Sequence, residues 1–245
     1  MSEEKTDEEP EAEENPQTGE ATAEETPTVK KDEEGQEVAA ELLLPIDDLL
    51  SAGIHIGTRV KTKNMRQFIY RVRPDGLFVL DVKKTDDRIR FASKFITRFE
   101  PSKVVAVSSR LYGRTPVQKF CEITGCRAIL GRFLPGLFSN PAHSAHIEAS
   151  LVIVTDPNAD SQAVEEAAAV GIPVIALCDT DNDFVGADLV IPINNKGRRA
   201  LATVYWLLAR QVLRERGELP ADGTLPASID DFETKLVEGL RETES

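Results

Sequence analysis

The stretch "SLVIVTDPNADSQAVEEAAAVGIPVIALCD", residues 150–179, indicates the fold class most directly. Its two ends, residues 150–156 and 173–179, are short and almost entirely apolar, which is typical of strands buried on both faces. Between them, residues 161–170 have helical spacing and stop at Gly171, a residue common just beyond a helix. Short apolar strands that alternate with helices indicate a parallel sheet covered by helices.

The same alternation extends in both directions along the chain. We predict further strands over 76–82, 104–109, 127–133 and 189–193. We predict helices over 45–53, over 86–99 with Thr85 as cap, from Thr115-Pro116 to Thr124, and from about Lys196 to Arg216. The predicted fold is therefore α/β, doubly wound, with three α/β/α layers and a mainly parallel sheet over residues 42–217, flanked by acidic flexible termini.

The net charge of −13 is distributed unevenly along the chain. Residues 1–41 contain 16 acidic and 3 basic residues, and residues 218–245 contain 8 acidic and 2 basic residues. Residues 59–132, in contrast, contain 18 basic and 6 acidic residues. The protein is thus a basic body with two acidic ends, and the charge of each segment says more about its partners than the total does.

The two acidic ends call for different predictions. Residues 1–41 are predicted to be a disordered acidic N-terminal arm, because they offer almost no large apolar side chain to bury. Such an arm either keeps the chain soluble or masks its basic surface. Residues 218–245 form an acidic C-terminal tail that either trails free or packs through Leu225, Ile229, Phe232 and Leu236.

Composition excludes several classes of protein. No apolar run approaches the roughly 18 residues of a membrane span. The first 20 residues lack the basic and apolar regions of a secretory signal. The three cysteines, Cys121, Cys126 and Cys178, are too few for a disulfide framework and indicate a reducing compartment. We therefore expect a cytoplasmic protein with no membrane partner.

Motifs of nucleotide-binding and hydrolytic enzymes are missing from the sequence. No G-x-G-x-x-G follows a strand, and neither a P-loop nor a G-x-S-x-G elbow occurs. Asp179, Asp181 and Asp183 follow a predicted strand and offer oxygen ligands, but the stretch lacks the Gly and Glu of an EF-hand loop. A polar loop at a strand end is the simpler interpretation of these residues.

Candidate metal and acid–base groups are equally weak. Four potential zinc ligands have a spacing that matches no zinc module known to us: Cys121, Cys126, His143 and His146. His55 lies between apolar residues and is expected to be partly buried rather than a general base. We expect no catalytic residue, no metal, no cofactor and no small-molecule substrate.

The basic features are stronger. Residues 58–73, "TRVKTKNMRQFIYRVR", contain six Lys and Arg and no acid, interleaved with Phe68 and Tyr70. This stretch is too highly charged for a buried strand, and we predict a free loop that a phosphate backbone would stabilise. The alternative is an ordinary solvated basic face.

A second basic feature is the corner at residues 194–199, where the last helix begins. The helix macrodipole disfavours cations at this end, yet Lys196, Arg198 and Arg199 gather there. We expect Asn195 to cap the helix, Gly197 to allow close approach of a backbone, and the three cations to bind phosphate.

Further cations at strand ends and in first helical turns extend these two features. The predicted RNA-binding residues are Arg59, Lys61, Lys63, Asn64, Arg66, Arg71, Arg73, Lys83, Lys84, Arg110, Arg114, Arg132, Asn194, Asn195, Lys196, Arg198 and Arg199.

Five stretches, in a fixed order, resemble the S2 family of small-subunit ribosomal proteins, in its archaeal and eukaryotic branch. They are "LLSAGIHIG", "GRFLPGLFSNP", "LVIVTDP", "IPVIALCDTD" and "IPINNKGRRALATVYWLLARQVL". The resemblance covers residues 42–216, and the long helical hairpin of the bacterial branch has no counterpart. The 42–217 domain is thus identified as an α/β ribosomal-protein domain.

The resemblance implies a structural protein without enzymatic activity, which supports translation from the solvent side of the small subunit, between head and body. It implies binding to small-subunit ribosomal RNA and to neighbouring small-subunit ribosomal proteins. It implies RNA contact only for residues 59–73 and 194–199. Residues 138–150 diverge from the family pattern, so His143 and His146 inherit no role.

Two other functions stay open from the residues alone. One is a nucleotide-binding enzyme in which Asp179, Asp181 and Asp183 hold a divalent ion. The other is a protein scaffold that works through the two acidic ends. Aromatic residues make up only 6% of the chain, which argues against a reader of single-stranded bases, because such proteins stack bases on aromatic platforms.

Overall fold

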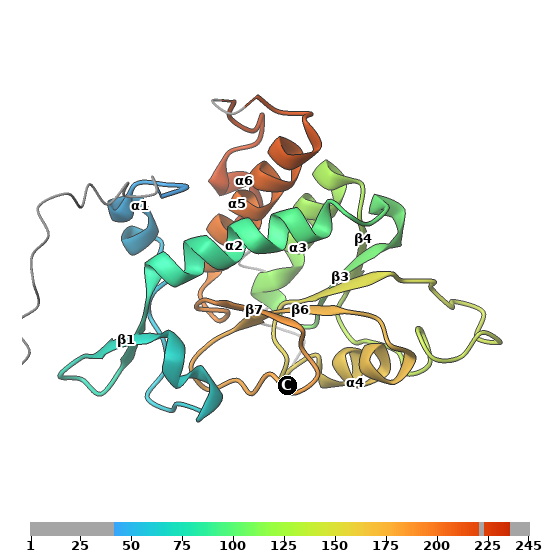
Figure 1. The fold of residues 1–245 in the computed structure, drawn as a ribbon, viewed down its shortest axis with the longest axis horizontal. Coiled ribbons are helices and arrows are strands. Elements are labelled where there is room, and N and C mark those ends of the chain that lie inside the picture. Colours follow the sequence, from blue (N-terminus) through green and yellow to red (C-terminus); the bar gives the residue numbers. More distant parts are fainter. Residues whose placement is uncertain (1–41, 221–222, 236–245) are drawn as a thin grey trace, which may run out of the picture. The chain divides into compact units, whose positions relative to one another are not determined.

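The computed structural model describes residues 42–220 and 223–235, so the predicted N-terminal arm, residues 1–41, lies outside the described residues. The chain divides into two units, Met1–Ala40 and Glu41–Ser245, and the fold below is that of the second. Its centre is a sheet of five parallel strands in the order β4-β3-β5-β6-β7 (Figure 1). The strands are β3 Val104–Ser108, β4 Arg127–Leu130, β5 Leu151–Val154, β6 Val174–Cys178 and β7 Leu189–Pro192.

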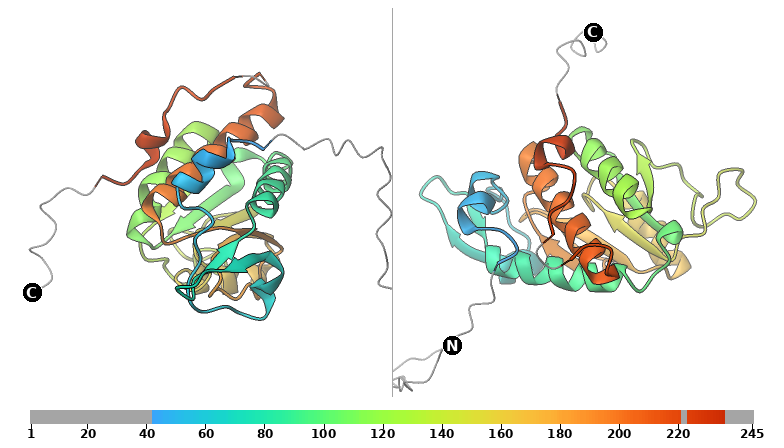
Figure 2. Two further views of the ribbon diagram at one scale, coloured as in Figure 1. Left: turned by 90° about the vertical axis from the view of Figure 1, so that its left-hand side faces the viewer. Right: turned by 90° about the horizontal axis from the view of Figure 1, so that it is seen from above.

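Helices cover both faces of this sheet. Three long helices lie on one face: α2 Val82–Ile96, α3 Leu111–Thr124 and α5 Arg198–Arg216 (Figures 1 and 2). Helix α4, Ser161–Val170, covers the other face, with the loop around Phe133 to Phe138. The predicted α/β class, with three layers and a mainly parallel sheet, is confirmed.

Alternation along the strands sends successive side chains to opposite faces. Ile153 and Ile175 pack with the three long helices, whereas Val152 and Val154 pack with α4. Because both faces are covered, every residue of β3, β5 and β6 is buried. This double burial is the physical reason why these strands are nearly continuous apolar runs in the sequence.

The basic stretch, residues 58–73, is structured rather than free. It contains a 3₁₀ helix, η1 Asn64–Phe68, and a strand, β1 Ile69–Val72, which pairs antiparallel with β2 Phe78–Leu80. Met65 and Phe68 are buried against β6 and β7. The prediction of a free loop is therefore wrong, because two apolar side chains among the charges fasten this stretch to the sheet.

Two helices begin earlier than predicted. Helix α2 begins at Val82, because Asp81 caps this helix. The Oδ1 atom of Asp81 accepts from the Lys83 N–H at 3.0 Å. The predicted cap, Thr85, lies inside the helix and donates to the Pro192 carbonyl. Helix α3 begins at Leu111 rather than at Thr115-Pro116 and contains Pro116 internally.

The proline inside α3 is accommodated by a distant residue. Pro116 has no N–H to donate to the carbonyl four residues earlier, that of Tyr112. The Thr234 hydroxyl donates to this carbonyl instead, at 3.2 Å. The cost of an internal proline is thereby reduced by a contact that local sequence does not reveal.

The remaining elements are short: α1 Ile46–Ser51, η2 Pro101–Lys103 and α6 Ile229–Phe232. Helix α6 belongs to the C-terminal tail, whose described residues 223–235 pack on the domain. Leu225 and Phe232 are buried, and the Trp206 indole N–H donates to the Ala227 carbonyl at 2.8 Å. Of the two alternatives for the tail, packing holds for this part, while Leu236 lies outside the described residues. Among the helices of the described ranges, none has the length and apolarity needed to cross a bilayer.

Candidate nucleic-acid interface

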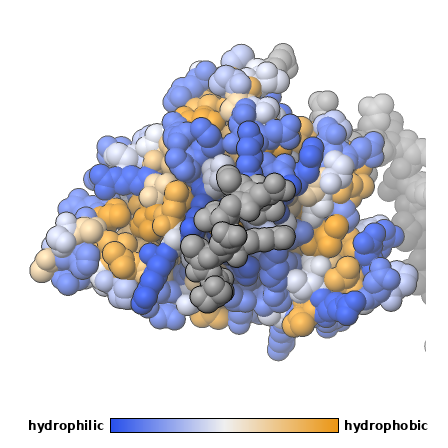
Figure 3. All heavy atoms as spheres, turned by 180° about the vertical axis from the view of Figure 1, so that it is seen from behind, coloured by the Kyte–Doolittle hydropathy of each residue, from blue (hydrophilic) through white to orange (hydrophobic). Residues whose placement is uncertain are grey.

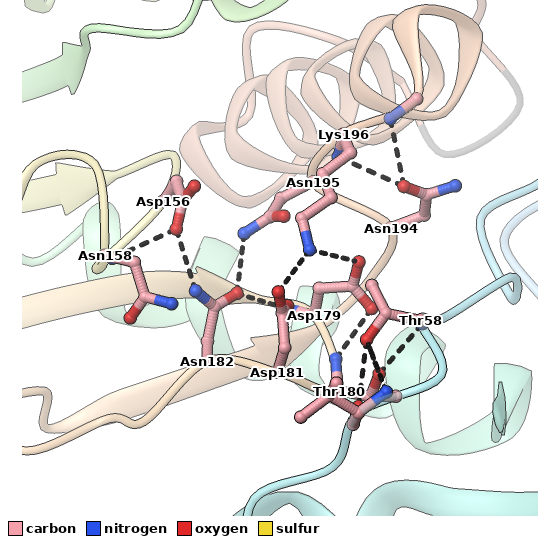
Figure 4. A network of polar contacts seen from close by, with 12 residues as sticks. Thr58, Asp156, Asn158, Asp179, Thr180, Asp181, Asn182, Asn194, Asn195 and Lys196 are labelled. Atoms are coloured by element: carbon pink, nitrogen blue, oxygen red, sulfur yellow. Dashed lines mark hydrogen bonds and ion pairs between the residues drawn. The ribbon is translucent and has the colours of Figure 1, made fainter. Parts of the chain in front are cut away.

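The carboxyl ends of β5, β6 and β7 meet around a buried polar network (Figure 4). Asn182 lies at its centre: its amide donates to Asp156 Oδ1 at 2.8 Å, and its Oδ1 accepts from the Asp179 N–H at 2.7 Å. The same Oδ1 accepts from the Asn195 amide at 2.9 Å. The side chains of Asp156, Asn182 and Asn195 are almost completely buried. Internal hydrogen bonds thus fill the crevice where an α/β enzyme would place a ligand.

The helix corner, residues 194–199, is organised by Asn194 and not by Asn195. Asn194 Oδ1 accepts from the N–H groups of Lys196 and Gly197, at 3.1 and 2.9 Å. Gly197 is the cap residue of α5, which begins at Arg198. The prediction that Asn195 caps this helix is wrong, because its side chain points into the buried network.

Gly197 is required by its own neighbours. A Cβ at this residue would lie 3.0 Å from Asn194 Nδ2 and 3.2 Å from the Ala200 Cβ, which is closer than ordinary packing. The glycine therefore makes room for the Asn194 side chain. This internal packing accounts for the residue without the approach of another backbone.

Lys196 is paired inside the protein. Its ammonium lies 2.5 Å from Asp181 Oδ2 and 3.6 Å from Asp179 Oδ2. Burial raises the pKa of Asp179 to about 6, although the Thr180 N–H and the Lys196 charge oppose this shift. Two of the three carboxylates considered above for a divalent ion, Asp179 and Asp181, thus already pair with an ammonium group, and Asp179 also accepts from a backbone N–H.

The basic stretch is fastened to the loop that holds these carboxylates, residues 179–188. Thr62 donates from its N–H to the Thr180 carbonyl and from its hydroxyl to the Asn182 carbonyl, both at 2.9 Å. The Asn64 amide donates to Asp183 Oδ1 at 2.7 Å. The structure therefore brings the basic stretch and the helix corner to two sides of one loop. It also gives Asn64 an internal partner.

All six cations of the basic stretch face solvent. They are Arg59, Lys61, Lys63, Arg66, Arg71 and Arg73. Within residues 42–220 and 223–235, none of the six has a carboxylate partner, although the Lys61 ammonium lies 4.9 Å from the centre of the Phe78 ring. The pKa of His55 is lowered by burial and then by the charges of Arg73 and Arg71. Both effects favour the uncharged imidazole, so His55 stays neutral to a lower pH than a free histidine does.

Lys83 and Lys84 extend this surface from the first turn of α2. Both are exposed, and the Lys84 ammonium donates to the Gln67 carbonyl at 2.5 Å. Lys84 therefore lies beside the basic stretch. Of the helix-corner cations, Arg198 pairs with Glu233 at 2.6 Å, whereas Arg199 is exposed and has no carboxylate partner in the described part of the chain.

The other predicted cations lie elsewhere, after β3, in the first turns of α3 and after β4. Arg110 pairs with the buried Asp156. Arg114 and Arg132 line a pocket of about 460 Å³, together with Ser109 and Asp160. Arg110 is thus occupied internally, while Arg114 and Arg132 remain exposed on a second, smaller basic surface.

Sequence reasoning missed the residues that hold this interface in place. Asp156, Asn182 and Thr62 carry no charge pattern that attracts notice, yet they join the strand ends and the basic stretch. A usable signal exists for the first two, because a polar residue just after a buried parallel strand points to the edge where strand ends meet. Thr62 gives no such signal.

The four potential zinc ligands considered in the sequence find no geometric support as a metal site. The part of the chain that the structure describes contains no group of three or more His, Cys, Asp or Glu side chains arranged to hold a metal ion. Cys121 lies on the buried side of α3, in the core, where burial raises the pKa of its thiol.

Comparison with known proteins gives one consistent result. A family model described as ribosomal protein S2 matches residues 49–149 and 138–215. Three relatives named small ribosomal subunit protein uS2 match as well. That of Staphylothermus marinus is 54% identical over 225 residues, which cover 92% of this chain and 99% of the relative.

The other two relatives agree with the first. The protein of Thermofilum pendens is 58% identical over 197 residues, covering 80% of this chain and 92% of the relative. That of Saccharolobus solfataricus is 51% identical over 220 residues, covering 90% of this chain and 94% of the relative. None of these names is that of an enzyme, which supports the prediction of a non-enzymatic protein over the nucleotide-binding alternative.

Proposed function

The chain belongs to the ribosomal protein S2 family, whose members are structural components of the small ribosomal subunit, and we propose that it binds ribosomal RNA through phosphate contacts of exposed cations. The surface for this contact is the basic stretch, extended by Lys83 and by Arg199 at the helix corner. The family membership confirms the resemblance found in the sequence. Family membership does not identify the residues that bind RNA, and these are part of the proposal.

One observation carries the proposal: six exposed cations, which have no carboxylate partner among the described residues, lie on a stretch that the fold holds in place. Mutual repulsion disfavours such a row of charges in the free protein, and phosphate groups relieve it. Because buried Met65 and Phe68 fix the backbone, little conformational entropy is lost when RNA binds. The contacts go to the backbone of RNA helices, since these are recognised mainly by shape, phosphate and 2′-hydroxyl groups.

Lys196, Arg198 and Arg110 have a smaller part in this proposal. Each already has a carboxylate partner, so a phosphate must compete with Asp181, Glu233 or Asp156. We retain them as RNA-binding residues of second rank. On the family resemblance, we also propose that the protein joins head and body on the solvent side, in a cytoplasmic ribosome.

The salt dependence of RNA binding tests the proposal. If about six phosphates are neutralised, log K for a small-subunit rRNA fragment should fall with log salt at a slope of roughly −4 to −5. The double variant Arg71→Gln/Arg73→Gln should weaken this slope by about 1.5.

The matched control is Lys103→Gln/Arg127→Gln, which removes two exposed cations outside the predicted set and should leave the slope unchanged. Fluorescence anisotropy at four or more salt concentrations gives both slopes. An affinity that does not respond to salt, or equal losses in the two variants, would contradict the proposal.

A further inference from the structure

The outer face of helix α2 exposes an aromatic side chain between cations. Arg88, Phe91, Lys94 and Phe95 lie on one side of the helix, since residues three or four positions apart share a side, and Arg98 follows just beyond the helix end. The opposite side, with Ile89, Ala92 and Ile96, is buried in the core. Phe91 is 61% exposed although it lies near the middle of a 15-residue helix.

Two hollows flank Phe91, and together they form what we call the α2 groove. One, of about 650 Å³, is lined by Phe91, Lys94, Phe95, Arg98, Asp188 and Leu189. The other, of about 530 Å³, is lined by Gln67, Phe68, Lys84, Asp87, Arg88 and Phe91. Phe91 is thus a ridge between two depressions, each floored by further apolar side chains.

The groove is bordered mainly by positive charge. Lys94 and Arg98 have no carboxylate partner in residues 42–220 and 223–235, and the Arg88 guanidinium lies 5.6 Å from the centre of the Phe68 ring. Of the two acids in the lining, Asp188 is engaged, since its Oδ2 accepts from the Val174 N–H at 2.8 Å. The available charge is therefore suited to carboxylates on a partner.

Apolar side chains alone would carry no inference, because folded proteins expose many of them. Figure 3 shows several apolar patches among hydrophilic side chains on the face opposite to that of Figure 1. What distinguishes the α2 groove is the combination of a protruding aromatic ring, two hollows, and cations that have no carboxylate partner within the described part of the chain. Aromatic residues and arginine are the residue types enriched in protein–protein interfaces.

We propose that the α2 groove binds an acidic segment of a neighbouring small-subunit protein. Apolar side chains of that segment fill the hollows on the two sides of Phe91, and its carboxylates pair with Arg88, Lys94 and Arg98. From Arg88 to its last residue, Ile96, the helix rises about 12 Å, enough for roughly two turns of a partner helix. The inference rests on the proposed function only in that the neighbour is sought within the small subunit.

The groove suits protein better than RNA. Its floor, formed by Phe68, Phe95 and Leu189, offers apolar surface and few hydrogen-bond partners for a base edge. RNA helices present phosphates and 2′-hydroxyl groups, which would leave this floor without apolar contacts. The groove nevertheless borders the basic stretch through Gln67 and Phe68, so the protein partner would lie next to the RNA.

Site-specific photo-crosslinking identifies the occupant. The photoreactive residue benzoylphenylalanine replaces Phe91 in the full chain, which is assembled into small subunits, irradiated and digested for mass spectrometry. The expected adduct is a peptide of another small-subunit protein with more Asp and Glu than Lys and Arg. Adducts to rRNA, to this chain's own residues, to a second copy, or no adduct above that of the same probe at Val185 would overturn the inference.

A binding measurement with the cross-linked peptide then tests the chemistry. Phe91→Ala should weaken its affinity roughly 30-fold, as expected for a central aromatic residue of an interface. Lys94→Glu/Arg98→Glu should also weaken the affinity for the peptide, and this loss should be larger at low salt than at high salt. Val185→Ala, which trims an apolar side chain that is 78% exposed outside the groove, should have no effect.

Affinity of Phe91→Ala within twofold of the unmodified chain would overturn the inference. The rRNA salt slope of Phe91→Ala is measured in parallel and is expected to stay unchanged. The two measurements together distinguish an error in the proposal for the α2 groove from an error in the proposed RNA contact. Circular dichroism of each variant confirms that the fold is retained.

Discussion

At the scale of the single residue, Lys196 shows how a cation is tolerated beside the start of a helix. The macrodipole of α5 disfavours positive charge there, but Asp181 and Asp179 supply two carboxylates at 2.5 and 3.6 Å. Arg198 is offset in the same way by Glu233. Two of the three cations that suggested a phosphate site in the sequence therefore have internal partners. The third, Arg199, faces solvent and has no carboxylate partner among the described residues.

The Asp179–Lys196 pair predicts a pH dependence of stability. The pKa of Asp179 is raised to about 6 in the folded protein, above its ordinary value of 3.8, so the folded state binds its proton more tightly than the unfolded state. Stability from this group therefore increases as pH falls through 6 towards 4. Relative to Asp179→Asn, the wild type should gain about 2 kcal/mol in free energy of unfolding between pH 7 and pH 4.5.

Urea unfolding of the two proteins at several pH values measures this difference. Asparagine keeps the oxygen that accepts from the Thr180 N–H, so the comparison isolates the titrating group. A difference that stays constant across this pH range would show that Asp179 titrates normally in the folded protein.

At the scale of the element, the strands of the parallel sheet were predictable, as was the start of α4 at Ser161, whereas the starts of α2, α3 and α5 were not. Burial on both faces produces apolar runs, and these runs mark β3, β5, β6 and β7 without knowledge of distant residues. Helix starts depend on single hydrogen bonds, which the patterns around Thr85, Pro116 and Asn195 did not distinguish. The competing caps were Asp81 for α2 and Gly197 for α5, and for α3 the distant Thr234 makes an internal proline acceptable.

The candidate interface was predictable to a similar degree. Local composition identified the basic stretch as charged and exposed, and this is how its cations lie. Composition could not indicate that Arg198 pairs with Glu233, or Asn64 with Asp183, because these partners are far apart in the chain. Nor could it indicate that Met65 and Phe68 hold the stretch to the sheet.

Substitutions at two adjacent residues of η1 should have separate effects, one on stability and the other on RNA binding. Met65 is fully buried, so Met65→Ala should lower the free energy of unfolding by about 2–5 kcal/mol through loss of packing. Arg66 is exposed, so Arg66→Ala should change stability by less than about 0.5 kcal/mol but should weaken binding to rRNA. Denaturant unfolding and anisotropy on both variants provide the comparison. Equal RNA affinity of Arg66→Ala and wild type, under conditions where both are folded, would remove Arg66 from the interface.

The packed C-terminal tail should limit the availability of Arg198. Glu233→Gln removes the charge of its partner and leaves the buried Phe232 and Leu225 in place. The variant should bind rRNA more tightly at low salt, with a slope steeper by about 0.7–0.9, because one further cation can reach phosphate. Asp230→Asn is the matched control, since Asp230 is an exposed acid of α6, the helix that Glu233 follows directly, and makes no ion pair in the described part of the chain. A slope identical for Glu233→Gln and the control would mean that Arg198 does not contact RNA.

At the scale of the whole molecule, the surfaces in the described part of Glu41–Ser245 differ in their chemistry. The carboxyl edge of the sheet, which in this fold class commonly holds a ligand, is closed by Asp156, Asn182 and Asn195. The basic stretch beside it carries exposed charge, and the α2 groove borders that stretch. An α/β fold familiar from nucleotide-binding enzymes thus becomes a scaffold that presents surfaces to larger partners, as a ribosomal protein requires.

Ultraviolet cross-linking of intact small subunits, with the adducts located by mass spectrometry, tests the central claim most directly. If phosphate contact holds the basic stretch, RNA adducts should fall within residues 59–73 and on Arg199, and should be lost from 59–73 in Arg71→Gln/Arg73→Gln. Subunits that contain the protein but show RNA adducts only outside residues 59–73 and 194–199 would contradict the claim.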